Sequence, residues 1–484
     1  MVKIHAKKHD NYSVEFKFAF EDNESLKDNR FAVNSWIFLP NSIGINPESY
    51  GKDQFYRDVK SNVRLITPRY SLKEISSPEA LPLSSVRKAM VDMTASADNM
   101  DEYEYHLKMF AAIFKSAIRE AEHQILGLRD LNRADALCES YCRDVSRIIS
   151  SYRSLYPILK DAGDNPRIRG YYKLVDEFIS YASEMRTLRI IKKLDGRKHT
   201  QISESTRSLL VNLVEEEKAY KQKCRYAVLS EDAEHNRQVV YHHGMLKKFV
   251  ESDLYINLDK KKDGVAVEQI YYSIAAGVAM IFATAVAWAT QVRYGNITWP
   301  LFIVLVISYM LKDRIKELMR FYFAHKLGNK YYDKKAKIQI GSKDVGIIKE
   351  GVDFISFGKT PQEVLKLRNV AATVDDASRI FDEKVLLYRK RVSIDSEALK
   401  ANNEYPVRGI NEIMRLHLTR FSQKMDNPEV PVNYLSREGT VNSVKVQKIY
   451  YINIVFQLCQ EDDIRYCHFR ISMTRDGIVK VEEL

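Results

Sequence analysis

The chain has 484 residues, of which 45% are hydrophobic and 29% are charged. This balance excludes a wholly disordered chain, and the length predicts two or three domains. The five cysteines are scattered and odd in number, which excludes a disulfide framework and favours a reducing compartment. The formal net charge of +11 is compatible with nucleic acid or anionic lipid, so the placement of the basic residues has to decide between them.

Residues 1–80 are expected to form a β-rich cytoplasmic unit. The run SVEFKFAF alternates between apolar and polar residues, and FAVNSWIFLP and NVRLITP are further candidate strands. The charged stretch from Met1 to Phe20 has no apolar core and does not look like a signal peptide.

Residues 81–264 are expected to form a helical domain. Apolar residues recur at steps of three and four, as at Tyr103, Leu107, Phe110 and Phe114. This spacing predicts long helices packed as a bundle or coiled coil, and it would also suit an oligomer interface.

Residues 265–311 predict a transmembrane helical hairpin. The run Ile270–Val292 has no charged residue. As a helix it would span roughly 34 Å, enough to cross a hydrocarbon core of about 30 Å. A polar turn at Arg293–Asn296 precedes a second run, Ile297–Leu311, which spans only roughly 22 Å. The alternative interpretation is a buried helical hairpin in a soluble protein.

Small residues form a stripe on the first span. They recur every fourth position, at Ala275, Ala279, Ala283 and Ala287. Such a stripe allows another helix to approach closely, and it could be the second span or a second copy of the chain.

Basic residues flank the predicted hairpin and predict its orientation. The expected inner-leaflet anchors are Lys260, Lys261, Lys262, Lys312, Arg314, Lys316 and Arg320. We therefore predict a multi-pass inner (plasma) membrane protein with both termini in the cytoplasm, bound to an anionic leaflet rather than to nucleic acid. Residues 312–335 are expected to continue as a basic amphipathic helix beside the membrane. The stretch from Gly277 to Arg320 resembles hairpins of bacterial inner-membrane proteins, without indicating a named family.

Residues 336–484 are expected to form a C-terminal α+β domain. KIQIGS and VDFISFG are candidate strands, followed by a short helix at Pro361–Leu367 and another at Ile410–Phe421. The end predicts antiparallel strands at Val444–Gln460, Ile464–Thr474 and Ile478–Glu482. The expected fold class is thus an α+β membrane protein with a β-rich N-terminal unit, a helical bundle, a two-helix transmembrane hairpin and a C-terminal antiparallel β domain.

The motifs for chemistry are few, and we expect no cofactor and no metal. Gly358-Lys359-Thr360 lacks the earlier glycine of a phosphate loop, since Asp353 stands there. His235, His242 and His243 are spaced too widely to chelate one metal by themselves. The cysteine pairs, Cys138 with Cys142 and Cys459 with Cys467, are more typical of inert thiols.

One pair resembles a catalytic motif in spacing alone. Arg237 and His242 have the R-x4-H spacing of HEPN ribonucleases, in which the His acts in acid–base cleavage and the Arg steadies phosphate charge. Arg320 and His325 have the same spacing, which shows how easily it arises.

Three functions remain, in order of preference. The first is a membrane-anchored interaction or signalling module that is not an enzyme and binds a protein partner or forms a homo-oligomer. The second is a self-assembling, membrane-perturbing effector that oligomerises through the alanine stripe. The third is a membrane-tethered ribonuclease that uses Arg237 and His242.

Overall fold

The computed structural model describes residues 2–484 except 24–25, 78, 96–98, 129, 161–165, 197–201, 257, 296–298, 329–331, 341–342, 371–382 and 402. The chain forms two compact units. The sheet unit comprises Met1–Val63, Ile256–Asn402 and Gly409–Leu484, and the helical unit comprises Arg64–Tyr255 and Asn403–Arg408. The sheet unit is therefore assembled from three separate stretches of chain.

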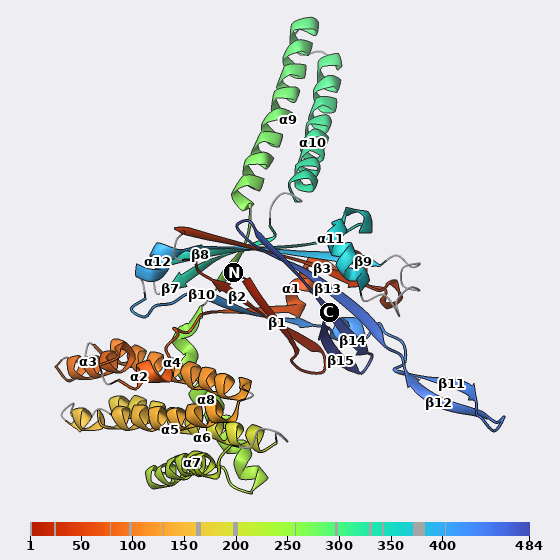
Figure 1. Ribbon diagram of the computed structural model, residues 1–484. Helices are drawn as coiled ribbons and strands as arrows, with labels where there is room; N and C mark the ends of the chain where they lie inside the picture. The colour runs from red at the N-terminus through yellow and green to blue at the C-terminus, as the bar shows by residue number, and fades with distance from the viewer. Residues whose placement is uncertain are drawn as a thin grey trace. The chain divides into compact units, whose positions relative to one another are not determined.

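An eight-stranded antiparallel sheet is the largest element of the sheet unit (Figure 1). Its strands run in the order β15-β14-β13-β3-β9-β8-β7-β6. They are β3 (Asp28–Leu39), β6 (Leu258–Lys262), β7 (Lys334–Ile340), β8 (Lys343–Ile355), β9 (Lys384–Asp395), β13 (Tyr450–Gln460), β14 (Asp463–Thr474) and β15 (Gly477–Glu483). The N-terminal strand β3 pairs with β9 on one side and with β13 on the other, so the two ends of the chain share one sheet.

A second sheet has the order β1-β2-β10-β4-β5. Its strands are β1 (Val2–Lys8), β2 (Ser13–Glu21), β4 (Val59–Leu65), β5 (Tyr255–Ile256) and β10 (Gly409–His417). The alternation in β2 directs Phe16, Phe18 and Phe20 to one face, where all three are buried. Phe16 lies 5.1 Å from Phe456 of β13, and Phe20 lies 5.4 Å from Phe31 of β3, so the two sheets pack through their phenylalanines.

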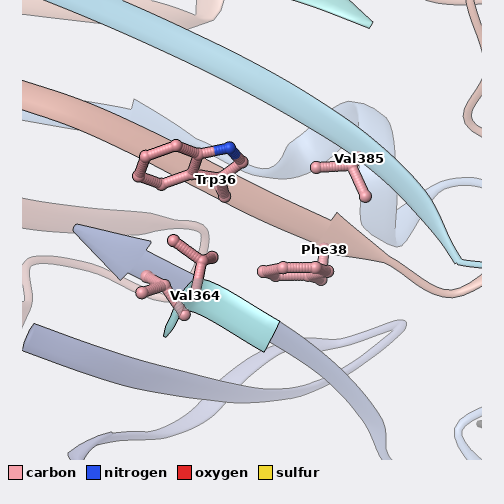
Figure 2. Close-up of a cluster of buried hydrophobic side chains, with 5 residues drawn as sticks. Trp36, Phe38, Val364 and Val385 are labelled. Carbon is pink, nitrogen blue, oxygen red and sulfur yellow. The ribbon is translucent and has the colours of Figure 1, made fainter. Parts of the chain in front are cut away.

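Short helices complete the sheet unit, and one of them packs on the larger sheet. These elements are η1 (Asn41–Ile43), α1 (Lys52–Asp58), η5 (Phe357–Lys359), α11 (Gln362–Val370), α12 (Ser396–Ala401) and α13 (Thr419–Ser422). Figure 2 shows Val364 of α11 beside Trp36 and Phe38 of β3 and Val385 of β9, in a buried cluster that also contains Val455. Trp36 and Phe38 share a face because they are two residues apart on a strand.

The helical unit contains long helices, as the apolar spacing predicts. They are α2 (Leu72–Ile75), α3 (Leu81–Ala95), α4 (Met100–Gly127), α5 (Leu131–Arg153), α6 (Pro166–Asp195), α7 (Glu204–Cys224) and α8 (Ala233–Glu251), with the short turns η3 (Tyr156–Lys160) and η4 (Ser252–Leu254). The residues of the predicted seam, Tyr103, Leu107, Phe110 and Phe114, are fully buried within this chain. They therefore belong to the core of the unit.

Several predicted elements are confirmed, and others are wrong. The strands at SVEFKFAF, FAVNSWIFLP and VDFISFG and the helix after Pro361 are confirmed. The predicted helix at Ile410–Phe421 is wrong, because this segment forms β10 and the short helix α13. Pairing with β2 along nine positions holds β10 extended, with Met414 and Leu416 facing the interior.

The expected fold class is also wrong in its overall arrangement. The N-terminal β unit and the C-terminal β domain are not separate, because β3 lies between strands from the C-terminal half. The structure is a mixed α and β fold with large antiparallel sheets.

Candidate functional site

Two long helices form an insertion between neighbouring strands of the large sheet. They are α9 (Val265–Tyr294) and α10 (Trp299–Gly328), which we call the arm (Figure 1). The strands before and after the arm, β6 and β7, pair with each other, and Lys262 lies opposite Lys334. The amide of Asp263 donates a hydrogen bond of 3.3 Å to the carbonyl of Asp333 and closes the base of the arm. Both ends of the arm therefore join the same edge of the sheet.

The alanine stripe lies between the two helices of the arm. Ala275 and Ala279 are fully buried, and Ala283 and Ala287 are partly buried. The hydroxyl of Ser308 on α10 donates to the carbonyl of Ala283 at 3.5 Å. Small side chains let two helix backbones approach closely, so the stripe contacts α10 of the same chain.

A pair of introduced cysteines tests this contact. With the five native cysteines replaced by serine, Ala283→Cys combined with Ser308→Cys is expected to form a disulfide within one chain, because the two helices touch at these positions. Non-reducing electrophoresis should show an oxidised monomer. The matched pair Ala283→Cys with Leu318→Cys, which lies ten residues further along α10, should stay reduced. A predominance of covalent dimers from the first pair would mean that the stripe faces a second copy.

The outer surface of the arm is apolar and exposed. α9 contains a stretch, Val267–Arg293, with a mean hydropathy of 1.8, and only 11% of its most apolar part is buried. The large apolar side chains that are more than one third exposed include Ile270, Ile274, Val278, Met280, Ile281, Phe282, Trp288, Val292, Trp299, Phe302, Ile303, Leu305, Val306, Ile307, Tyr309, Met310 and Leu311. A core helix of a soluble protein has most of such side chains buried, so α9 does not fit that alternative.

The second helix of the arm becomes charged partway along its length. The Ser308–Ala283 contact and the 5.0 Å separation between the Phe323 and Tyr271 rings fix the pairing of the two antiparallel helices. Lys312, four residues beyond Ser308, therefore lies level with Ala279. From this level to the C-terminal end of α9 and the start of α10, both helices are apolar. This shared apolar section is about 20 Å long.

The predicted two-helix transmembrane hairpin, 270–292 and 297–311, is therefore wrong. Among the described residues only one helix, Val267–Arg293, is long and apolar enough to cross a membrane. The physical reason is that α10 has only 13 residues, Trp299–Leu311, before its charges begin at Lys312. The first two residues of the predicted second span, at 297 and 298, lie outside the described residues.

The predicted basic anchors fall into two groups. Four of them contact a carboxylate: Lys260 with Glu350 (3.1 Å), Lys261 with Asp259 (2.9 Å), Lys262 with Glu268 (2.7 Å) and Arg314 with Glu317 (3.3 Å), whereas Arg320 lies 4.9 Å from the centre of the Tyr272 ring. Lys312 and Lys316 have no carboxylate partner among the residues that the structure describes, although Lys312 lies 3.8 Å from the centre of the Tyr309 ring. These two lysines lie where the apolar part of α10 ends.

Buried charges hold the base of the arm. Lys260 of β6 contacts Glu350 of β8, and Glu350 also contacts Lys390 of β9 at 3.1 Å. Lys390 in turn contacts Glu412 of β10. Burial acts to raise the pKa of Glu350, but Lys390 and Lys260 outweigh it and hold that pKa at about 2. A cavity of about 440 Å³ lies beside this cluster and reaches the first turn of α9 at Glu268.

A hairpin of two strands exposes apolar side chains elsewhere in the sheet unit. Among the strands that the structure describes, β11 (Glu429–Leu435) and β12 (Val441–Gln447) pair only with each other (Figure 1). Every residue in them is exposed. Val430 lies opposite Val446, and Val432 lies opposite Val444, so all four side chains share one face. Because an isolated hairpin is only marginally stable in water, this face is suited to contact another molecule.

The predicted ribonuclease pair is not joined in the structure. Arg237 contacts Glu234 at 2.8 Å, whereas His242 contacts Glu177 at 3.1 Å. Five residues of helix separate the two side chains by about 140° around the axis of α8, so they point in different directions.

The other candidate residues also show no shared site. His235 lies 3.0 Å from the carbonyl of Val228, and no group of three or more metal-ligating side chains occurs among the described residues. Burial raises the pKa of the thiols of Cys138 and Cys142 to about 12, which makes them poor nucleophiles.

Sequence reasoning missed the residues that shape the base of the arm. Asp263 and Asp333 are 70 residues apart in the sequence. The cluster around Lys390 joins strands whose order in the sheets could not be known from the sequence. The only signal in the sequence was the presence of charged residues, such as Glu350 and Lys390, within runs that otherwise predict buried strands.

The comparisons with known proteins add no assignment. No protein-family model matches the sequence, and neither a curated protein nor a solved structure shows a significant match.

Proposed function

We propose that this chain is a membrane-anchored interaction or signalling module that is not an enzyme. The tip of the arm inserts into the inner (plasma) membrane, and the two units remain in the cytoplasm. The observation that carries the proposal is the exposure of the apolar stretch Val267–Arg293. Only 11% of its most apolar part is buried within the chain. Leaving so much apolar helix in water is unfavourable, and a lipid bilayer removes it from water without a protein partner.

The depth of insertion follows from the level at which the charges begin. The section that is apolar on both helices is about 20 Å long, which is shorter than a hydrocarbon core of about 30 Å. The arm therefore enters the bilayer from one side and reaches past its midplane. The pairing of β6 with β7 supports this geometry, because both ends of the arm return to the same sheet.

Charge at the end of the apolar section selects the anionic leaflet. Lys312 and Lys316 are free of carboxylate partners in the described part of the chain and lie at the expected level of the lipid headgroups. Each lysine near an anionic leaflet contributes about 1 kcal/mol to binding. The exposed apolar face of β11 and β12 supports the second half of the proposal, since it offers a surface for a protein partner or a second copy.

Flotation of the purified full chain with vesicles tests the proposal. We expect binding to phosphatidylcholine vesicles and tighter binding when phosphatidylserine is included. Replacing Lys312 and Lys316 by glutamine should weaken binding to the anionic vesicles by roughly 10- to 30-fold at low salt and leave binding to the neutral vesicles unchanged.

The matched control replaces Lys445 and Lys480, which lie on β12 and β15, by glutamine. This variant keeps the same net charge as the first and should bind like the unmodified chain. If the unmodified chain does not float with the vesicles of either lipid mixture, the membrane anchor is refuted.

A further inference from the structure

A second cavity lies within the helical unit, and membrane attachment gives it no role. Its volume is about 400 Å³, and α4, α6 and α8 contribute its walls. This volume is within the range of small-molecule sites, about 300–1,000 Å³. Phe178 and Tyr181 of α6 supply flat apolar surfaces in this cavity.

The charged side chains in the cavity wall are all basic. They are Lys115, Arg186, Arg189 and Lys247, and no Asp or Glu of the described residues lines the cavity. Arg186 and Arg189 share a single carboxylate, that of Glu122, at 2.5 Å and 2.9 Å. The cavity therefore carries an excess of positive charge.

Lys247 is the least compensated of these cations, whereas Lys115 is paired. Lys247 has no carboxylate partner in the described ranges of the helical unit. Lys115 forms an ion pair with Glu251, which acts to raise the pKa of Lys115, but burial outweighs this effect and lowers that pKa. Cations gathered in this way attract an anion with several oxygen atoms.

An unpaired histidine lies in the same wall. His243 is only 6% exposed, and neither of its ring nitrogens has a hydrogen-bond partner in the structure. One face of its ring stacks on Tyr181, with the centroids 3.5 Å apart and the planes 12° from parallel. Burial and the nearby Lys221 and His242 lower the pKa of His243 to about 4, so the ring is neutral near pH 7 and has one donor and one acceptor.

Buried polar atoms in folded proteins nearly always have a partner. The two nitrogens of His243 are buried at the wall of a cavity whose charges are all positive. A ligand that brings both hydrogen-bonding atoms and negative charge would satisfy the histidine and the cations together.

We propose that this cavity binds a nucleotide. The phosphate groups would contact Arg186, Arg189 and Lys247, and the base would pack against Phe178, with its edge hydrogen-bonded to His243, whose ring lies on that of Tyr181. This inference goes beyond the proposed membrane anchor and does not depend on it, since every residue of the cavity belongs to the helical unit.

Calorimetric titration of the purified full chain with single ligands tests the site. The probes are ATP, GTP, AMP, GMP, inorganic phosphate and a short single-stranded RNA, each raised to about 1 mM. We expect at least one free nucleotide to bind more tightly than inorganic phosphate and the RNA. The proposal is overturned if no nucleotide binds, or if inorganic phosphate binds as tightly as the nucleotides. It is also overturned if only the RNA binds.

Variants in the wall and beside it make the test specific. Lys247→Ala should weaken nucleotide binding about tenfold, because it removes a cation that contacts phosphate. Lys248→Ala is the matched control, since Lys248 is the next residue on α8, is also exposed and does not line the cavity. His243→Phe keeps an aromatic ring but removes both nitrogens, and it should weaken the nucleotide more than inorganic phosphate. Equal affinities for the unmodified chain and Lys247→Ala would place the nucleotide elsewhere.

Discussion

Replacing Lys390 by methionine is expected to lower the free energy of unfolding of the sheet unit by about 3–5 kcal/mol. Lys390 is only 2% exposed and contacts the carboxylates of Glu350 and Glu412. Without it, Glu350 keeps Lys260, but Glu412 is left fully buried with no cation from the residues that the structure describes. A buried charge that loses its only counter-ion costs more than the ion pair contributed.

Urea unfolding followed by tryptophan fluorescence measures this change. The three tryptophans, Trp36, Trp288 and Trp299, all belong to the sheet unit, and Trp36 is buried in the cluster shown in Figure 2. Replacing Trp288 and Trp299 by phenylalanine leaves Trp36 as a reporter of this unit alone.

Two further variants separate charge from packing. Lys384→Met alters an exposed lysine on the same strand, β9, and should change the stability by less than about 0.5 kcal/mol. Adding Glu412→Gln to Lys390→Met should restore part of the loss, because the unpaired charge is then gone. A stability of Lys390→Met equal to that of the unmodified chain would mean that the cluster does not hold the base of the arm.

Aspartates at the tip of the arm are expected to release the protein from membranes. Trp288 and Phe302 are 72% and 60% exposed, and both lie well past the level at which the charges of α10 begin, toward the tip of the arm. Each aspartate in the hydrocarbon core costs about 2.5–3.5 kcal/mol, so Trp288→Asp combined with Phe302→Asp should reduce vesicle binding by at least about 1,000-fold.

Leu318→Asp is the matched control for this variant. Leu318 is 67% exposed on the same helix, but it lies among the charged residues beyond Lys312. We expect it to bind vesicles nearly as well as the unmodified chain in the flotation assay. If it releases the protein as strongly as the tip variant, the arm inserts deeper than its apolar section. If the tip variant stays bound, the tip does not contact lipid.

The local features of this chain could be predicted from the sequence, because they depend on the order of neighbouring residues. The alternation in β2, the seam of Tyr103, Leu107 and Phe110 in α4, and the apolar run of α9 all repeat with the period of their element. The alanine stripe was also visible for this reason. The spacing alone could not show that it contacts Ser308 of the same chain.

The arrangement of these elements was decided by contacts between residues far apart in the sequence. β10 is a strand because it pairs with β2, some 390 residues earlier, although its apolar spacing was compatible with a helix. β3 joins the two ends of the chain in one sheet for the same reason, and the cavity of the helical unit exists only because α4, α6 and α8 meet. The sequence by itself determined which segments are apolar and how each one repeats. The tertiary structure decided which of these surfaces face each other, because burial and charge pairing depend on distances in space.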